Sequence, residues 1–462
     1  MYQQRVNFPA FALSLFFALT VLMTGAVAQQ PRVKAPPSSV PAPPVPVLPV
    51  LKTVEIFPAP ADDISSFEDE EPYLSSRGVL VEALDGRTIT QEFADQQFNP
   101  ASTIKLATAL AALRTFGPQH RFSTVVWTNG TFDQATHTIT GDLIISGRDP
   151  SFHYEHGVML ARELNRQGIR TVTGDLIVAP RFTMNYNSSA VRSGEWLYDT
   201  LDATRRPSIA TRAWYEARQA LSDTASLQTV PSVAVMGAVY VDSAPAGARQ
   251  LLTHRSSTLV DILKVLLCYS NNFMAERLGD SLGGPQGLRR FLISTAGVNP
   301  SEVALASTSG LGINRMTPRV MMRTYRALLS ELAKHRLSPS DIMPVAGIDP
   351  GTLRKRFTTY PSRGSVIAKT GTLPRSDGGV SALVGQTRAK NGETLLFVIF
   401  NQRGNVVSFR RGQEELVTQW QNERGGPAPF AYTPFTLAMR LANTELDAAR
   451  SSITNEYEPA AN

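Results

Sequence analysis

The chain has 462 residues, a length that suggests two or three domains, or one large domain with an insertion. Its apolar share of 42% is enough for a packed core, and the formal net charge of +6 suits contact with anionic surfaces. The charge is spread along the chain without a Lys/Arg-rich block, so we expect no nucleic-acid partner.

The first 28 residues have the pattern of a secretory signal. Arg5 is the only charge before an apolar run over 8–23, and the small residues Ala26-Val27-Ala28 follow. The alternative is a retained membrane anchor, but the run is short for a spanning helix, which needs about 20 apolar residues. We therefore expect cleavage after Ala28, no stable transmembrane span afterwards, and a periplasmic or other extracytoplasmic location.

Residues 29–72 cannot form a core. They begin with a Pro-rich stretch, "PPSSVPAPPVPVLP", and end in an acidic one, "DDISSFEDEEP". Such a composition favours an extended linker. Cys268 is the only cysteine, which excludes an intramolecular disulfide, and its apolar context predicts a buried, unreactive thiol.

The remaining patterns indicate an α+β fold. A strand, an Asp85-Gly86 turn and a second strand are followed by a helix after Pro100. Residues 117–245 have a different pattern of elements, with short strands around a helix. This pattern indicates an inserted α+β domain. Helices return from about residue 250, and three apolar strands close the fold. We assign 73–116 and 246–440 to one domain and 441–462 to a polar, weakly helical tail.

Three small motifs follow one another in the chain: Ser102-Thr103-Ile104-Lys105 at a helix start, Ser270-Asn271-Asn272 between two helical stretches, and Lys369-Thr370-Gly371-Thr372 at the end of a strand. Each alone has an ordinary structural explanation: a helix N-cap, a polar kink and a strand-end turn. Their joint presence in this order is far more specific.

Together the motifs suit nucleophilic catalysis by a serine. Ser102 and Lys105 share a helix face, and a lysine with a lowered pKa can activate a hydroxyl. Lys369 would supply the second cation that lowers this pKa. Ser270 would relay the proton to a leaving amine, and Asn272 would orient Lys105 and the substrate amide. Thr370 and Lys369 would bind a carboxylate, and the N–H groups of Ser102 and Thr372 would form an oxyanion hole.

These motifs resemble those of the penicillin-recognising serine acyltransferases. With "FNPASTIKLAT", "TGDLIISGRDPSF", "CYSNNFMAERL" and "PVAGIDPGTLRKRF", the chain is most similar to the class C low-molecular-mass penicillin-binding proteins, the D-Ala-D-Ala carboxypeptidase/endopeptidase family. The resemblance implies a penicillin-binding, serine β-lactamase-like transpeptidase domain. That domain has a five-stranded antiparallel sheet covered by helices, an all-helical lobe, and inserted domains between the first two motifs.

Two of the departures from the family pattern concern the site loop and the insertion. The family has an acidic residue where this sequence has Ser307, and the insertion is reduced, because 183–245 is short for a second full unit. One register question stays open: Tyr269-Ser270-Asn271 also fits a Y-x-N motif, in which Tyr269 would carry the proton. We favour Ser270 and Asn272.

Other candidate sites are weaker. His153 and His156 lack a third ligand, so we expect no metal and no cofactor. Glu163 and Asn165 fit an ordinary amphipathic helix, and Asp149 and Asp175 fit turns.

The sequence therefore predicts an exported serine D-Ala-D-Ala carboxypeptidase or endopeptidase. Its partners would be peptidoglycan stem peptides, with β-lactam antibiotics as inhibitors that acylate Ser102. Two alternatives stay open. One is a serine β-lactamase, although no dedicated deacylating glutamate is evident. The other is a catalytically silent peptidoglycan-binding protein.

Overall fold

The computed structural model describes residues 76–223, 230–434 and 436–448, all within one unit that spans Glu70–Asn462. The predicted signal at 1–28, the predicted linker at 29–72 and the end of the predicted tail lie outside these residues. In the part of the chain that is described, no helix is long and apolar enough to cross a membrane.

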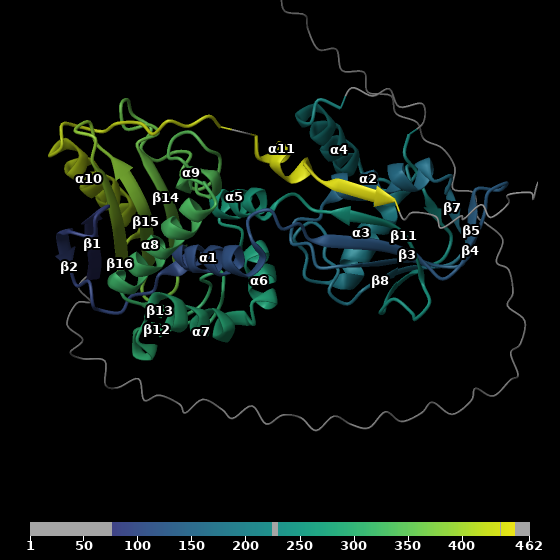
Figure 1. Cartoon of the computed structure of the whole chain (residues 1–462), viewed down its shortest axis with the longest axis horizontal. Coiled ribbons are helices and arrows are strands. Elements are labelled where there is room, and N and C mark those ends of the chain that lie inside the picture. Colours follow the sequence, from purple (N-terminus) through teal and green to yellow (C-terminus); the bar gives the residue numbers. More distant parts are fainter. Residues whose placement is uncertain (1–75, 224–229, 435, 449–462) are drawn as a thin grey trace, which may run out of the picture. The chain divides into compact units, whose positions relative to one another are not determined.

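A five-stranded antiparallel sheet organises the part of the chain that carries the three motifs (Figure 1). Its order is β14-β15-β16-β1-β2, so the predicted sheet is confirmed and β14 is an edge strand. The three C-terminal strands are buried almost throughout because helices cover both faces of the sheet. The strands are β1 (Ser76–Ala83), β2 (Thr88–Glu92), β14 (Val366–Leu373), β15 (Val380–Arg388) and β16 (Thr394–Gln402).

Helices cover the two faces of this sheet unequally. On one face α10 packs through Val417 and Trp420, and on the other face lies the larger core that includes residues of α1, α5 and α8. The helical elements of this part are η2 (Ala101–Ile104), α1 (Lys105–Phe116), α5 (Leu259–Tyr269), α6 (Asn272–Ser281), α7 (Gly284–Ala296), η3 (Pro300–Glu302), α8 (Pro318–Lys334), α9 (Pro339–Ile342), α10 (Val406–Asn422) and α11 (Leu437–Ala442).

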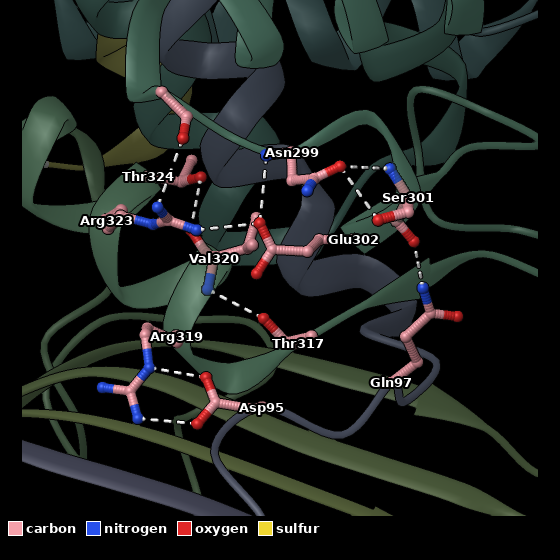
Figure 2. Close-up of polar contacts among 11 residues, drawn as sticks. Asp95, Gln97, Asn299, Ser301, Glu302, Thr317, Arg319, Val320, Arg323 and Thr324 are labelled. Carbon is pink, nitrogen blue, oxygen red and sulfur yellow. Dashed lines mark hydrogen bonds and ion pairs between the residues drawn. The ribbon is translucent and has the colours of Figure 1, made fainter.

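The segment that leads from β2 to η2 is attached to the start of α8 and to η3 (Figure 2). Arg319 on α8 makes two hydrogen bonds to the Asp95 carboxylate, at 2.6 and 2.9 Å. The Gln97 side chain donates to the Ser301 carbonyl at 2.6 Å. Thr317 caps α8, with its hydroxyl accepting from the Val320 N–H. Contacts with α8 and with η3 therefore fix the residues that lie just before the first motif.

The residues between α1 and α5 form a smaller sheet, β4-β5-β7-β9, and, together with the C-terminal strand β17 (Glu445–Ala448), a second larger sheet with its own core in the order β10-β8-β6-β3-β11-β17. The described residues of this region include the helices α2 (Tyr154–Arg166), α3 (Ala190–Leu201) and α4 (Ser208–Ala220). Its strands are β3 (Ser123–Thr128), β4 (Thr131–Asp133), β5 (Thr138–Thr140), β6 (Leu143–Gly147), β7 (Thr171–Val172), β8 (Leu176–Val178), β9 (Ala234–Val235), β10 (Val239–Val241) and β11 (Arg249–Arg255).

Two parts of this sheet differ from our expectation. Strand β11 pairs with β3, so the sheet of the insertion extends past the expected boundary at residue 245. The expected polar tail contains the end of α11, and then strand β17 (Glu445–Ala448), which pairs with β11. Across this pairing, Arg255 on β11 donates to the Asp447 carboxylate at 2.9 Å. Short strands β12 (Val303–Ala304) and β13 (Arg315–Met316) complete the described elements.

Candidate active site

Ser102 lies in the short 3-10 turn η2, immediately before α1 begins at Lys105. The turn is fixed from its N-terminal side, where the Asn99 side chain accepts a hydrogen bond from the Ala101 N–H at 3.0 Å. Phe98, fully buried, bonds the backbone of Met316 in both directions. Neither η2 nor α1 has a side-chain cap, so the structure does not use Ser102 as the N-cap that its sequence position also allowed.

Lys105 connects Ser102 to the second motif. Its Nζ donates to Ser102 Oγ at 3.0 Å, to Asn272 Oδ1 at 2.7 Å and to the Ser309 carbonyl at 2.5 Å. The side chain is completely buried. Burial lowers the pKa of Lys105 to about 7, although the nearby Glu276 carboxylate acts in the opposite direction. An amine in this state can be neutral at physiological pH and can accept a proton from a hydroxyl.

Ser270 and Lys369 form the second contact between a hydroxyl and an amine. Ser270 adopts a left-handed conformation, φ 55°, at the break between α5 and α6. Lys369 Nζ donates to Ser270 Oγ at 2.8 Å and to the Thr370 carbonyl at 2.6 Å. Burial, and then the charge of Lys105, hold the pKa of Lys369 well below its usual range. The predicted residues of all three motifs thus meet in one site.

The hydrogen bonds of the second motif distinguish its two possible registers. Ser270 accepts from Lys369 and Asn272 accepts from Lys105, whereas Asn271 caps α6 by accepting from the Met274 N–H at 2.9 Å. The Tyr269 side chain is half exposed. The two lysines therefore contact Ser270 and Asn272, which is the register that we favoured.

The third motif lies on the edge strand β14. Gly371 faces η2 so closely that a Cβ at this position would be 2.8 Å from the Pro100 carbonyl oxygen. Thr370 and Thr372 point to the other side of the strand, because successive side chains alternate. Thr372 directly follows Gly371, so its backbone is next to the strand position that faces the Ser102 turn.

Glu276 is a site residue that we did not predict. Its carboxylate accepts from the Ser309 N–H at 3.0 Å and from the Thr308 hydroxyl at 2.8 Å. It thereby holds the loop whose Ser309 carbonyl binds Lys105. A signal was available in the sequence, since Glu276 follows Asn272 by four positions and so lies on the same face of a helix.

The departure at Ser307 also has a structural explanation. Its hydroxyl accepts from the Gly310 N–H at 2.9 Å and donates to the Leu311 carbonyl at 2.8 Å. An aspartate could also accept from the Gly310 N–H, whereas the donation to the Leu311 carbonyl needs the hydroxyl of serine. Gly310 itself has φ 88°, and a Cβ there would lie 2.0 Å from the Ala101 carbonyl oxygen. The loop can approach the Ser102 turn this closely only with glycine at position 310.

The weaker candidates have structural roles. Glu163 pairs with Arg166 on α2, and the Asn165 side chain binds backbone carbonyls. Asp149 accepts from the N–H of Ser151 in a turn. Asp175 likewise accepts from a backbone N–H, that of Ala238. His153 and His156 lie at the start of α2, and across the described ranges there is no group of three or more side chains that could hold a metal ion.

Comparison with known proteins identifies a family. The D-Ala-D-Ala carboxypeptidase 3 (S13) family matches residues 62–199 and 202–422 of this chain. A carboxypeptidase from Mycobacterium tuberculosis is 28% identical over 372 residues, which are 74% of this chain and 79% of the relative. A D-alanyl-D-alanine carboxypeptidase from Actinomadura is 33% identical over 230 residues, 46% of this chain and 37% of that protein.

Solved structures show the same fold. A predatory endopeptidase from Bdellovibrio bacteriovorus, acylated by penicillin G and in complex with an immunity protein, has a TM-score of 0.65 at 23% identity. The match covers 80% of this chain and 99% of that one. Penicillin-binding protein 4 from Haemophilus influenzae has a TM-score of 0.56 at 22% identity and covers 75% and 97% of the two chains.

Proposed function

The chain belongs to the D-Ala-D-Ala carboxypeptidase S13 family of serine peptidases that act on peptidoglycan, and we propose that Ser102 is its nucleophile and Lys105 the base that activates it. One observation carries this proposal: the Lys105 amine, with its lowered pKa, lies 3.0 Å from the Ser102 hydroxyl. The remaining roles follow from the contacts around these two residues.

Acylation would proceed by one proton transfer and one nucleophilic attack. Neutral Lys105 takes the proton of Ser102, and the serine oxygen attacks the carbonyl carbon between the two D-alanines. The N–H groups of Ser102 and Thr372 stabilise the oxyanion of the tetrahedral intermediate. The Asn272 side chain, which binds Lys105 at 2.7 Å, keeps the amine in place. This contact also leaves the amide nitrogen of Asn272 for the substrate.

Collapse of the intermediate needs a proton on the leaving amine. Ser270 donates its own proton to that amine and takes one from the Lys369 amine. The proton that Lys105 accepted from Ser102 replaces it. Lys369 is suited to this role because its Nζ lies 2.8 Å from Ser270 Oγ. D-Ala leaves, and an acyl-enzyme on Ser102 remains. Water, deprotonated by Lys105, then hydrolyses the ester and restores the serine. If the leaving amine belongs to a second stem peptide, the same steps cleave a cross-link.

β-Lactams would follow the first half of this sequence. The strained lactam carbonyl takes the place of the D-Ala-D-Ala amide, Ser102 opens the ring, and the leaving nitrogen stays covalently attached to the acyl group. Slow hydrolysis of this ester makes the drug an inhibitor, whereas rapid hydrolysis would make the protein a β-lactamase.

The location and domain organisation belong to the same proposal. Peptidoglycan lies outside the cytoplasmic membrane, which agrees with the secretory pattern of residues 1–28 and cleavage after Ala28. We assign 73–116 and 246–440 to the catalytic domain and 117–245 to the insertion, except that strand β11 (Arg249–Arg255) lies in the sheet of the insertion. Pro-rich residues 29–72 serve as a linker.

Intact-mass spectrometry after brief exposure to benzylpenicillin tests the proposal. The purified protein should gain the mass of one drug molecule, and Ser102→Ala should gain none. Ser294→Ala, which changes an exposed serine on α7, is the matched control and should be acylated like the wild type. Rapid loss of the drug without a mass gain would favour the β-lactamase. An untouched drug and no gain would favour a silent binding protein.

A further inference from the structure

A groove of about 1030 Å³ opens beside the third motif, on the side of β14 that faces α10. It is lined on the strand by Thr370 and Thr372, on the helix by residues from Val407 onward, and on a third side by Thr352 and Lys355. The Thr352 N–H bonds the Cys268 carbonyl, two residues before Ser270. Thr370, which lines the groove, directly follows Lys369, whose amine donates to Ser270 Oγ at 2.8 Å, so the groove adjoins the catalytic residues.

One cation reaches from the helix to the catalytic strand. The Arg410 guanidinium donates to Thr372 Oγ1 at 3.0 Å, and its side chain is exposed to solvent. Thr370 and Thr372 lie on the same side of β14, two residues apart, so both hydroxyls face the space that Arg410 borders. Two hydroxyls and a guanidinium are a suitable set of donors for a carboxylate.

The charge of Arg410 is not neutralised by an acid among the described residues. Arg356 in the same groove is different, because it pairs with Glu414 at 2.7 Å. Arg356 also donates to the backbone carbonyl of Arg410 at 3.1 Å, and this contact fixes that turn of α10. Of these two arginines, only Arg410 is left available for an anion from outside the protein.

Lys369 is poorly placed to supply that charge alone. It is completely buried, and its amine already donates to Ser270 Oγ and to the Thr370 carbonyl. An ammonium in this setting has a lowered pKa, so its positive charge varies with the state of the neighbouring Lys105. A guanidinium stays charged at every pH at which the enzyme works.

We propose that Arg410 is a specificity-determining residue that binds the carboxylate of the leaving D-Ala, together with the hydroxyls of Thr370 and Thr372. The carboxylate would replace Thr372 as the partner of one guanidinium N–H, or share the guanidinium with it. This inference rests on the proposed function, since the carboxylate belongs to the group that departs when Ser102 is acylated. It explains why a cation from α10 lies at the end of the catalytic strand.

The test compares ligands with and without the carboxylate. We would measure the acylation rate constant for benzylpenicillin and for its methyl ester, and the cleavage of a D-Ala-D-Ala peptide and of its C-terminal amide. Arg410→Ala should lower the rates for both free carboxylates about 10- to 100-fold, as expected for the loss of a charged hydrogen bond. It should change the rates for the ester and the amide little. Arg410→Lys should restore part of the preference.

Arg411→Ala is the matched control. Arg411 is the next residue on α10 and lines the same groove, so its loss removes the same charge without removing the contact to Thr372. It should leave the preference for a free carboxylate unchanged. An equal fall for charged and masked ligands in Arg410→Ala, or no fall, would overturn the inference. If the wild type is neither acylated nor active, the proposed function fails first, and this inference fails with it.

Discussion

Buried titratable side chains occur in two regions of this molecule, and their surroundings differ. Around the catalytic motifs, Lys105, Lys264 and Lys369 are fully buried, and each amine has at least two hydrogen-bond partners. In the inserted sheet, His254 is just as buried, but neither ring nitrogen has a partner, and one oxygen of Asp149 also has none.

The difference shows that a buried ionisable group needs hydrogen-bond partners if it is to take part in proton transfer. A charge that is removed from water is tolerated where protein acceptors replace the water, and such groups can then exchange protons. The His254 ring packs edge-to-face against Phe152, with ring centroids 5.4 Å apart, and lies tilted against His156 at 4.9 Å. Burial holds the pKa of His254 well below the usual value. It is therefore a neutral packing residue. Four variants test this distinction, in order of the expected effect.

The largest effect is expected from Lys105→Met, which keeps most of the side-chain volume and removes the amine. Loss of a general base lowers rates by about 10²- to 10⁴-fold, so the acylation rate constant for benzylpenicillin should fall by this factor. Lys390→Met, an exposed lysine, is the control and should react normally. Acylation at an unchanged rate, in a variant whose melting temperature is close to the wild type, would remove Lys105 from the mechanism.

Lys264→Met tests a buried lysine that supports the site. Its amine bonds the Asp349 carboxylate at 2.7 Å, and both side chains are fully buried. The variant leaves the carboxylate without its cation, which should cost about 3–5 kcal/mol in the free energy of unfolding. Lys334→Met, which breaks a pair with an exposed lysine, should cost under about 1 kcal/mol. Urea unfolding of both proteins measures the difference, and equal costs would refute the distinction.

Glu276→Gln should shift the pH dependence of the acylation rate constant. The Glu276 carboxylate raises the pKa of Lys105 against the larger effect of burial, so its neutralisation should lower that pKa further. Lys105 acts when neutral, and the acid limb of the acylation rate should therefore move to lower pH. A limb that stays in place, or moves to higher pH, would show that Glu276 acts only by holding the loop of Thr308 and Ser309.

His254→Leu should have the smallest effect, on the pH dependence of stability. A folded-state pKa below the ordinary value of 6.5 means that the unfolded chain binds the proton more tightly. The contribution of His254 is therefore fully present above the unfolded pKa and is lost as the pH falls below it. The melting temperature of the variant should decline less on acidification than that of the wild type. The exposed His335→Leu should behave like the wild type.

Much of the site could be predicted from the sequence, because its parts are local motifs. Ser102 and Lys105 are three residues apart on adjoining helical turns, and the motif of Ser270 and Asn272 also acts over three positions. The contact of Ser270 with Lys369 could be expected only from the order of the motifs and the resemblance to a family, since no spacing rule relates positions so far apart. The structure brings both pairs together.

The unpredicted parts depend on backbone groups and on long-range pairing. The Ser309 carbonyl that binds Lys105 has no sequence signature, because every residue has a carbonyl. Strand β17 is short and polar, and it forms beside β11 through contacts that only the folded chain provides. The contact of Arg410 with Thr372 could not be predicted either, since an arginine on an amphipathic helix ordinarily faces solvent.

The pH dependence of acylation by benzylpenicillin tests the central claim most directly, because it measures whether a neutral amine activates Ser102. With a Lys105 pKa of about 7, the rate constant should be small at acid pH, rise through pH 7 and level off above it. Lys105→Met should lose this limb together with most of the rate. A wild-type rate that is flat through this range, or that falls as the pH rises, would contradict activation of Ser102 by Lys105.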